Sequence, residues 1–152
     1  MSNPPAVIDE ETFSVSRSIF IAASPSKVWT AITDPEHIVK WFGSGATLSA
    51  LEPGGTGVWT FDGYGDVPIL VEALDPIHSI TYRWGDTTSP NIDLAASTVF
   101  TFTLEPTEGG THLHVIETGF DTLADPARQM HDNQGGWTTE LDKMVAYVES
   151  LS

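Results

Sequence analysis

The chain has 152 residues, 40% of them hydrophobic, and six Lys and Arg against 21 Asp and Glu give it a net charge of −15 at pH 7. This length suits one domain with a sizeable core, and the absence of cysteine excludes disulfides and thiolate chemistry. A field of this sign repels phosphate backbones and anionic lipid headgroups, so we expect neither nucleic acid nor a membrane surface as a partner.

The first eleven residues are polar and acidic and contain two prolines without regular apolar spacing. We therefore expect residues 1–11 to form a flexible N-terminal tail, followed by a single domain over residues 12–152. The tail lacks the basic-then-apolar order of a secretory signal, and no stretch approaches the length of a membrane span. These features predict a cytoplasmic location without membrane insertion.

Residues 13–21 alternate between apolar and polar side chains, as in a strand with one covered face. The inward positions hold Phe13, Val15, Ile19 and Ile21. Arg17 falls in the same inward register, and a buried guanidinium requires a partner. Arg17 is therefore a candidate functional residue.

Two short helices are expected after this strand. Ser24-Pro25 and Asp34-Pro35 each place a capping side chain before a proline at the first helical position. Glu36 adds a negative charge in the first turn of the second helix, where the helix dipole favours it. Trp41 and Phe42 lie on the apolar side of that helix and begin an aromatic cluster.

Residues 43–119 alternate between apolar runs and turn sequences, which predicts about six strands. Turns are expected at Asp62-Gly63, at Asp75-Pro76 and at Glu108-Gly109-Gly110, the last being a strong hairpin signal. Residues 85–94 contain Pro90 and few apolar side chains, so we expect a mobile loop at the rim of the sheet.

The last stretch, residues 125–151, has the spacing of a long amphipathic helix. Its apolar residues recur at steps of four, three, four and three, which places in one stripe Trp137, Leu141, Met144, Val148 and Leu151. Such a stripe requires an apolar surface to cover it, and only the strands supply one. The chain order therefore predicts an α+β fold in which a curved antiparallel sheet wraps around the C-terminal helix.

Aromatic residues from these elements, with one methionine of the final helix, form the candidate wall of a ligand pocket between helix and sheet. They are Trp41, Phe42, Trp59, Phe61, Tyr82, Trp84, Phe102, Met130 and Trp137. The same side chains also suit a filled core, and we expect a part of them to serve only that purpose. Gly135-Gly136 costs the helix about 1 kcal/mol for each glycine relative to alanine, so close approach to the sheet, a bend or room for a ligand should offset it.

Several of these sequences together resemble one known family. They are Val28-Trp29 after Ser24-Pro25, Asp34-Pro35-Glu36 with Trp41-Phe42 behind it, Asp75-Pro76 followed by Tyr82 and Trp84, Gly110-Thr111 opening a strand that ends in Gly119-Phe120, and Gly135-Gly136-Trp137. Over residues 12–151 the chain is similar to the heat-shock-protein-90 ATPase activator homologue family of the START-like, or SRPBCC, superfamily of helix-grip proteins. The resemblance implies a seven-stranded sheet that grips the C-terminal helix around an apolar cavity.

In the strand order that the resemblance implies, the first strand lies beside the one that opens at Gly110-Thr111. Glu117 shares the inward register of Leu113 and Val115, so it would lie near inward Arg17. Burial would raise the pKa of such a carboxyl, and the guanidinium would lower it again. We expect this pair either to fix a polar group of a ligand or to be a static buried ion pair.

Other chemistry finds little support in the sequence. His112 and His114 share one face of a strand but are expected outside the sheet, with no carboxylate cluster nearby, so no metal site is expected. His131 would be a general base if it faced the cavity. The sequence contains no zinc, nucleotide or flavin motif, and no cofactor is expected.

The leading hypothesis is a non-enzymatic binding protein that holds a small hydrophobic or amphipathic ligand between the helix and the sheet. The first alternative is an aromatase/cyclase-like or hydrolytic enzyme with Glu117 or His131 as acid or base and Arg17 as the charge holder. The second alternative is a chaperone-linked interaction module in the stress response. Direct chaperone contact is doubtful, because in the eukaryotic co-chaperone of the family a separate N-terminal region makes much of that contact, and this sequence has no room for it. The family resemblance also suggests a homodimer that forms through an edge strand or through the rim loop of residues 85–94.

Overall fold

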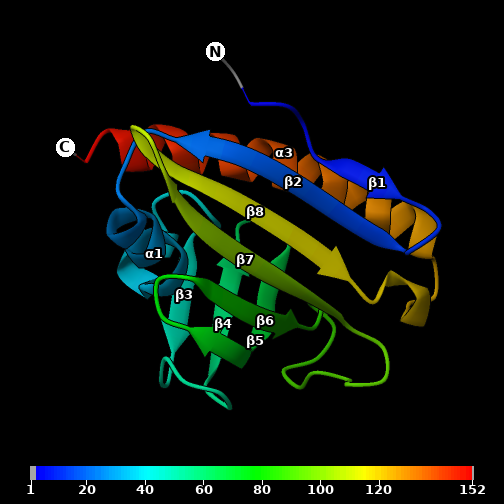
Figure 1. Cartoon of the computed structure of the whole chain (residues 1–152). Helices are drawn as coiled ribbons and strands as arrows, with labels where there is room; N and C mark the ends of the chain where they lie inside the picture. The colour runs from blue at the N-terminus through cyan, green and yellow to red at the C-terminus, as the bar shows by residue number, and fades with distance from the viewer. Residues whose placement is uncertain (1–2, 152) are drawn as a thin grey trace.

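The computed structural model describes residues 3–151. Its elements in chain order are β1 (Val7–Asp9), β2 (Ser14–Ile21), α1 (Pro25–Thr33), α2 (Pro35–Ile38), β3 (Gly45–Leu48), β4 (Thr56–Phe61), β5 (Gly65–Asp75), β6 (Ser79–Trp84), β7 (Thr98–Thr107), β8 (Gly110–Thr118), the 3-10 helix η1 (Phe120–Thr122) and α3 (Pro126–Glu149). All eight strands form one antiparallel sheet in the order β1-β2-β8-β7-β6-β5-β4-β3, and α3 lies along β1 and β2 (Figure 1). This is the α+β helix-grip layout that the sequence predicted.

The strand order confirms one expectation and extends another. The strand that begins at Ser14 pairs with β8 along its whole length, as the resemblance implied. The sheet has eight strands rather than about seven, because the short strand β1 adds itself to the outer edge of β2.

Both short helices begin at the positions that their capping residues indicated in the sequence. The Ser24 side chain accepts a hydrogen bond from the Lys27 backbone N–H, and Pro25 is the first residue of α1. The Asp34 carboxylate accepts a bond of 3.0 Å from the Glu36 N–H at the start of α2. The chain therefore turns sharply between two capped helices, and Trp41 and Phe42, which follow the second helix, are buried in the core.

The C-terminal helix α3 is the longest element of the described chain. Asp125 caps it, and Pro126 is its first residue. Its buried side chains form the predicted stripe, extended by about two turns toward the N-terminus: Met130, Trp137, Leu141, Met144 and Val148. Leu151 lies beyond the end of the helix and is half-buried.

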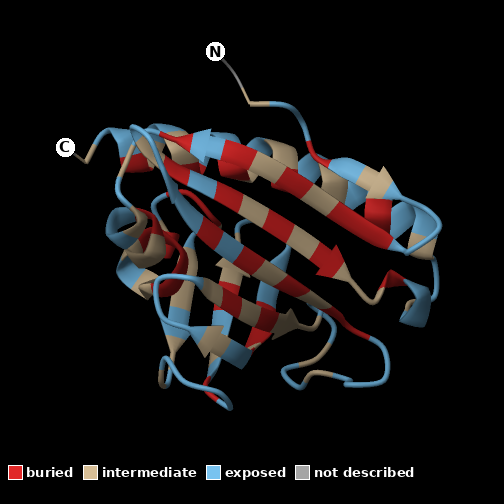
Figure 2. Ribbon diagram, viewed as in Figure 1, coloured by how far each residue is buried: buried red, intermediate tan, exposed pale blue. Residues whose placement is uncertain are grey.

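Buried and less buried side chains alternate along the long strands, as Figure 2 shows for β2, β7 and β8. On β8 the buried positions are Thr111, Leu113, Val115 and Glu117. The period of two residues thus carries an acidic side chain into a core in which most buried side chains are apolar.

Residues 3–9, which the sequence predicted as part of a flexible tail, lie against the rest of the domain. Ala6 is buried; its N–H donates to the Thr138 hydroxyl at 3.0 Å, and its carbonyl accepts from the Gln134 side chain at 2.9 Å. Backbone groups make these contacts, and backbone groups leave no residue-type pattern in a sequence. The segment therefore lies as a strap over α3 and β2, while its flexibility and the domain boundary at residue 12 stay predictions.

Within residues 3–151, no helix combines the length and the apolar character that crossing a bilayer requires.

Candidate functional site

Glu117 is fully buried near the end of β8. In the sheet it lies opposite Val15 of β2 and Phe100 of β7, so its side chain extends into the space between the sheet and α3. The sequence predicted this inward orientation from the register of β8. The position makes Glu117 the only buried carboxylate of the described residues.

Four side chains donate hydrogen bonds to the Glu117 carboxylate. Trp137 Nε1–H donates to Oε1 at 2.9 Å, and Trp84 Nε1–H and the Thr98 hydroxyl donate to Oε2 at 3.0 and 2.6 Å. The Asn133 amide spans both oxygens at 2.9 and 3.1 Å. The donors come from β6, β7 and α3, so one carboxylate joins the helix to two strands.

None of these donors carries a charge. Within the described part of the chain, the ion pairs are Arg17–Asp142, Arg83–Glu72 and Lys143–Glu140, and Glu117 belongs to none of them. Burial raises the pKa of the Glu117 carboxyl above its ordinary value, and the hydrogen bonds from Thr98, Trp137, Asn133 and Trp84 act in the opposite direction without cancelling the effect of burial.

Aromatic rings surround this carboxylate. Trp84 and Trp137 stack with ring centroids 5.9 Å apart, and the Phe100 centroid lies 4.5 Å from that of Trp84. Phe42 and Phe102 form T-shaped pairs with Trp137, with ring centroids 5.8 and 5.9 Å apart. Several residues of the predicted wall therefore lie around the carboxylate, together with Phe100, while their role as the wall of a ligand pocket stays a prediction.

The aromatic rings of this wall pack against one another, which differs from the open gap that we expected between the helix and the sheet. The rings of Trp59, Tyr82 and Phe100 continue the same chain of contacts at 5.2 to 5.9 Å, and Trp41 and Phe61 contact Phe42 at 5.0 and 5.2 Å. Large aromatic side chains fill the interior because each one reaches far from its strand. The interior is closed in this structure.

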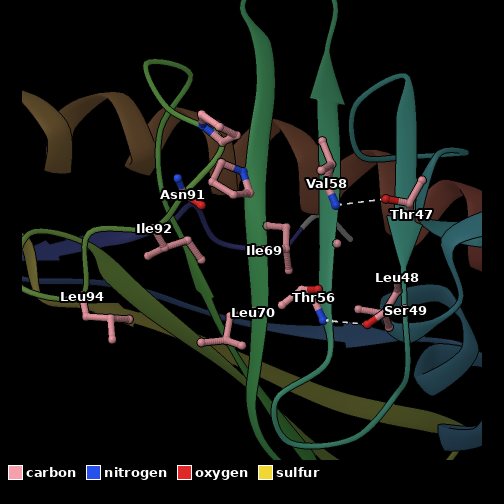
Figure 3. A pocket seen from close by; sticks show the side chains of 13 residues that line it. Thr47, Leu48, Ser49, Thr56, Val58, Ile69, Leu70, Asn91, Ile92 and Leu94 are labelled. Atoms are coloured by element: carbon pink, nitrogen blue, oxygen red, sulfur yellow. Dashed lines mark hydrogen bonds between the residues drawn. The ribbon is translucent and has the colours of Figure 1, made fainter.

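Hollows of about 670 and 340 Å³ lie instead on the outer face of β4 and β5. The larger one extends from β3 to the loop between β6 and β7, and Figure 3 shows Ile92 and Leu94 of this loop beside Leu70. The sequence predicted this loop at the rim of the sheet but gave no sign of a hollow beneath it. Both hollows lie on the side of the sheet opposite to Glu117.

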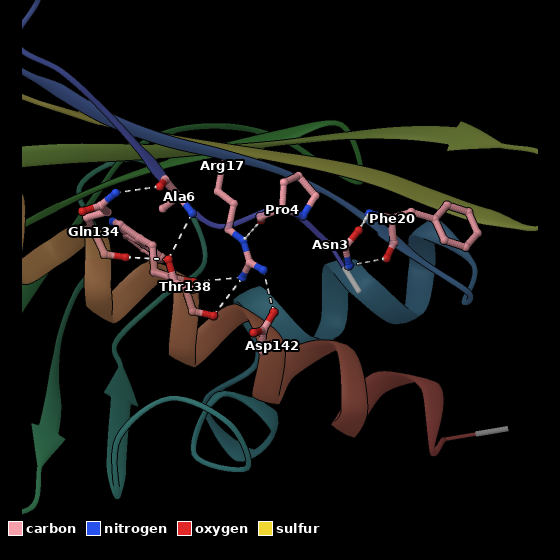
Figure 4. A network of polar contacts seen from close by, with 9 residues as sticks. Asn3, Pro4, Ala6, Arg17, Phe20, Gln134, Thr138 and Asp142 are labelled. Atoms are coloured by element: carbon pink, nitrogen blue, oxygen red, sulfur yellow. Dashed lines mark hydrogen bonds and ion pairs between the residues drawn. The ribbon is translucent and has the colours of Figure 1, made fainter. Parts of the chain in front are cut away.

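The expected pair between Arg17 and Glu117 is wrong. Arg17 is buried, but its guanidinium forms an ion pair with Asp142 of α3 at 2.5 Å and donates to the Thr138 and Trp137 carbonyls at 2.9 and 3.3 Å (Figure 4). Its Nε–H donates to the Pro4 carbonyl at 2.8 Å. These acceptors on α3 and the N-terminal segment receive four hydrogen bonds from the guanidinium, so Arg17 links β2 to α3 and to the N-terminal segment.

The histidines lie away from the carboxylate. His131 follows buried Met130 on α3 and is exposed, so it does not face the interior and cannot act there as a base. His114 meets the Ser18 hydroxyl at 2.8 Å on the outer face of the sheet, and His112 is exposed. Among the described residues, no three His, Asp or Glu side chains gather as a metal site.

Gly135 and Gly136 lie on the exposed side of α3. A Cβ atom at either position would meet nothing within 4 Å. Close approach to the sheet, one of the three expected reasons for this pair, is therefore wrong. The glycines leave a weak point in the helix between Asn133 and Trp137, the two residues of α3 that hold Glu117.

Sequence reasoning missed Asn133 and Thr98. Asn133 precedes Trp137 by four residues, so both lie on one face of α3, and this spacing was a usable signal. Thr98 lies opposite Trp84 in the pairing of β6 and β7, which requires the register to be known. The site thus depends on one local pattern, the spacing of Asn133 and Trp137 on α3, and on one pairing between separate strands, that of Trp84 with Thr98.

Comparisons with known proteins agree with this architecture. A family model described as activator of Hsp90 ATPase homolog 1-like protein matches residues 22–149. A search of the curated proteins finds no match. Protein MLL2253 from Mesorhizobium loti has a similar structure, with 28% identity and a TM-score of 0.78 over 91% of this chain and 98% of that chain.

Two more distant structures share the fold. The Aha1 dimer from Colwellia psychrerythraea has 22% identity and a TM-score of 0.73 over 90% of this chain and 96% of that chain. CalU16 from Micromonospora echinospora has 20% identity and a TM-score of 0.68 over 89% of this chain and 75% of that chain.

Proposed function

The chain belongs to the activator of Hsp90 ATPase homolog 1-like family, and on this premise we propose that it binds a small, largely apolar molecule in the aromatic interior between α3 and the sheet. The resemblance seen in the sequence is thereby confirmed. In this proposal Glu117 is the polar anchor of the ligand, and the aromatic wall around Trp84 and Trp137 receives the apolar body.

One observation supports the proposal above all: Glu117 is a fully buried carboxylate without a cation. Removing a charge from water costs several kcal/mol, and a purely structural site would normally supply an opposite charge. Arg17 shows that arrangement in the same molecule, since it is paired with Asp142. A buried carboxylate with a perturbed pKa and an aromatic surround is typical of functional sites.

Binding requires the closed interior to open. The side of the site nearest to solvent is formed by Asn133 and Trp84, which are both half-buried, whereas Thr98 and Trp137 are buried. Gly135-Gly136 weakens α3 beside the same residues. Movement of the N-terminal part of α3 away from the ends of β6 and β7 that carry Trp84 and Thr98 would therefore admit a ligand to Glu117 with the least loss of packing.

The indole N–H groups of the site offer a direct test. A panel of amines, alcohols and carboxylates on phenylethyl, indolylethyl and naphthylethyl bodies is added to ¹⁵N-labelled protein, and the indole N–H resonances are followed by NMR. A binder should shift the resonances of Trp84 and Trp137, because both indoles bond Glu117. Trp41, whose indole donates to the Ala31 carbonyl, is the internal control and should keep its position. Unchanged Trp84 and Trp137 resonances with every member of the panel would overturn the proposal.

A further inference from the structure

The hydrogen bonds of Glu117 differ in how firmly each donor is held. Trp84 donates to both Thr98 Oγ1 and Glu117, at 2.8 and 3.0 Å, so these two donors support each other at the ends of paired strands. Trp137 is buried within the stripe of α3. Asn133 is half-buried, and the side chain that holds it is exposed Gln129, at 2.8 Å. Asn133 is therefore the donor that a ligand can displace at the lowest cost.

Asn133 also occupies a distinctive place on the carboxylate. Its Nδ2 lies 2.9 and 3.1 Å from the two oxygens of Glu117, so a single nitrogen bridges them. An ammonium nitrogen in this place would form the same two hydrogen bonds with a full positive charge. Charge-assisted hydrogen bonds are about twice as strong as neutral ones, and the exclusion of water strengthens them further.

The surroundings favour a cation over a neutral group of the same size. Trp84 and Trp137 donate only neutral N–H groups to the carboxylate, so neither ring compensates its charge. No lysine, arginine or histidine of residues 3–151 compensates the charge of Glu117. The net charge of −15 concentrates cations near the surface and repels anions.

From these contacts we infer that the ligand is a primary amine on an aromatic or other apolar body, whose ammonium group displaces the Asn133 amide and pairs with Glu117. This inference rests on the proposed function, because it names the class of molecule that the same interior binds. The apolar body lies among the rings that now fill the space between α3 and β6 and β7.

Matched ligands separate the charge from the apolar body. Tryptamine, tryptophol and indole-3-acetate carry an ammonium, a hydroxyl and a carboxylate on the same ring, and isothermal titration calorimetry at pH 7 and low salt measures their affinities. Tryptamine should bind at least about tenfold more tightly than tryptophol, and indole-3-acetate should bind least. The phenylethyl and naphthylethyl amines and alcohols repeat the comparison on a smaller and a larger body.

Two substitutions locate the preference at Glu117. Glu117→Gln removes the charge and should bring the affinity for tryptamine down to that for tryptophol. Asn133→Lys leaves the carboxylate intact and supplies a cation from the protein, so it should remove the same preference even if the glutamine variant does not fold. Asp132→Asn is the control, because it changes the net charge by the same one unit as Asn133→Lys at the adjacent exposed residue. This control should keep the preference.

Each outcome has a defined meaning. Equal affinities for amine and alcohol would overturn the inference and leave the proposed function standing. Failure of all three bodies to bind, with any head group, would overturn the proposed function and this inference with it. A preference for amines that Asp132→Asn weakens as strongly as Asn133→Lys would assign the effect to the general field of the protein and would also overturn the inference.

Discussion

At the scale of single residues, Glu117 and Arg17 show two ways to bury a charge on neighbouring strands. Arg17 has an ion-pair partner whose own side chain is 59% exposed, and three backbone carbonyls accept further hydrogen bonds from its guanidinium. Glu117 has neutral donors alone. The imbalance at Glu117 therefore appears as a raised pKa, and the pH dependence of stability measures it directly.

We predict that rising pH destabilises the protein at Glu117. Burial raises the pKa of this carboxyl in the folded state, so the folded chain holds a proton over a pH range in which the unfolded chain has already lost it. The free energy of unfolding then falls as pH rises from the ordinary glutamate pKa through the raised one, by about 1.4 kcal/mol for each unit that separates them. Glu117→Gln cannot titrate, so its free energy of unfolding should not show this fall.

Urea unfolding of both proteins between pH 4 and pH 8 provides the measurement. The difference between the two curves isolates Glu117, because all other carboxyls are common to both. Asp132→Asn, which removes an exposed carboxyl from the same helix, should retain the fall seen in the wild type, because Glu117 is intact. Parallel curves for wild type and Glu117→Gln would show that the folded and unfolded pKa values are equal.

The sequence predicted the direction of these side chains better than their partners. The period of two residues sets the inward register of Arg17 and Glu117, and both are buried as expected. Their partners lie on α3, and its rotation and height above the sheet depend on the packing of the whole aromatic core. For this reason the local pattern indicated Trp137 as an inward residue but not that it would bond Glu117.

At the scale of whole elements, local sequence patterns predicted the helices and the long strands, whereas β1, which depends on contacts with distant residues, was missed. α1, α2 and α3 each carry a capping residue and a proline at the start, and β7 and β8 flank a hairpin turn, so local chemistry specified all of them. β1 has only three residues, and backbone hydrogen bonds and the burial of one alanine hold its segment in place. Contacts of that kind become visible only when α3 and β2 are already in position.

The paired glycines of α3 allow a prediction at this scale. The double substitution of Gly135→Ala and Gly136→Ala should stabilise the protein by about 1 kcal/mol for each site, because alanine is the better helix former and a Cβ meets open space at both positions. Thermal unfolding should show the gain as a higher Tm. If α3 opens at these glycines to admit ligands, tryptamine should also associate more slowly with the stiffened helix, as stopped-flow fluorescence would measure.

A third glycine supplies the contrast. Gly119 has a φ of +97°, and a Cβ there would lie 2.8 Å from the Ser97 carbonyl oxygen, so Gly119→Ala should destabilise the protein by about 1–3 kcal/mol. Equal effects of alanine at all three positions would mean that the environment of α3 is not as open as its geometry indicates.

At the scale of the whole molecule, the excess of negative charge opposes folding. The chain has 21 acidic residues and only six Lys and Arg. Within the described residues, three of these cations, Arg17, Arg83 and Lys143, form ion pairs. Most of the acidic side chains therefore repel one another without a close partner, and salt should weaken this repulsion more than it weakens the few attractions.

Salt should consequently move stability and ligand affinity in opposite directions. The Debye length falls from about 30 Å at 0.01 M to about 10 Å at 0.1 M salt, so adding NaCl over this range should raise the Tm through reduced self-repulsion. The same screening removes the field that attracts a cationic ligand, so the affinity for tryptamine should fall while that for tryptophol stays constant. Differential scanning calorimetry and titration calorimetry at matched NaCl concentrations measure the two trends. Asp132→Asn should reduce both slopes slightly, since it removes one exposed charge, whereas a Tm that falls with added salt would show that attractions, not repulsions, dominate the surface of this protein.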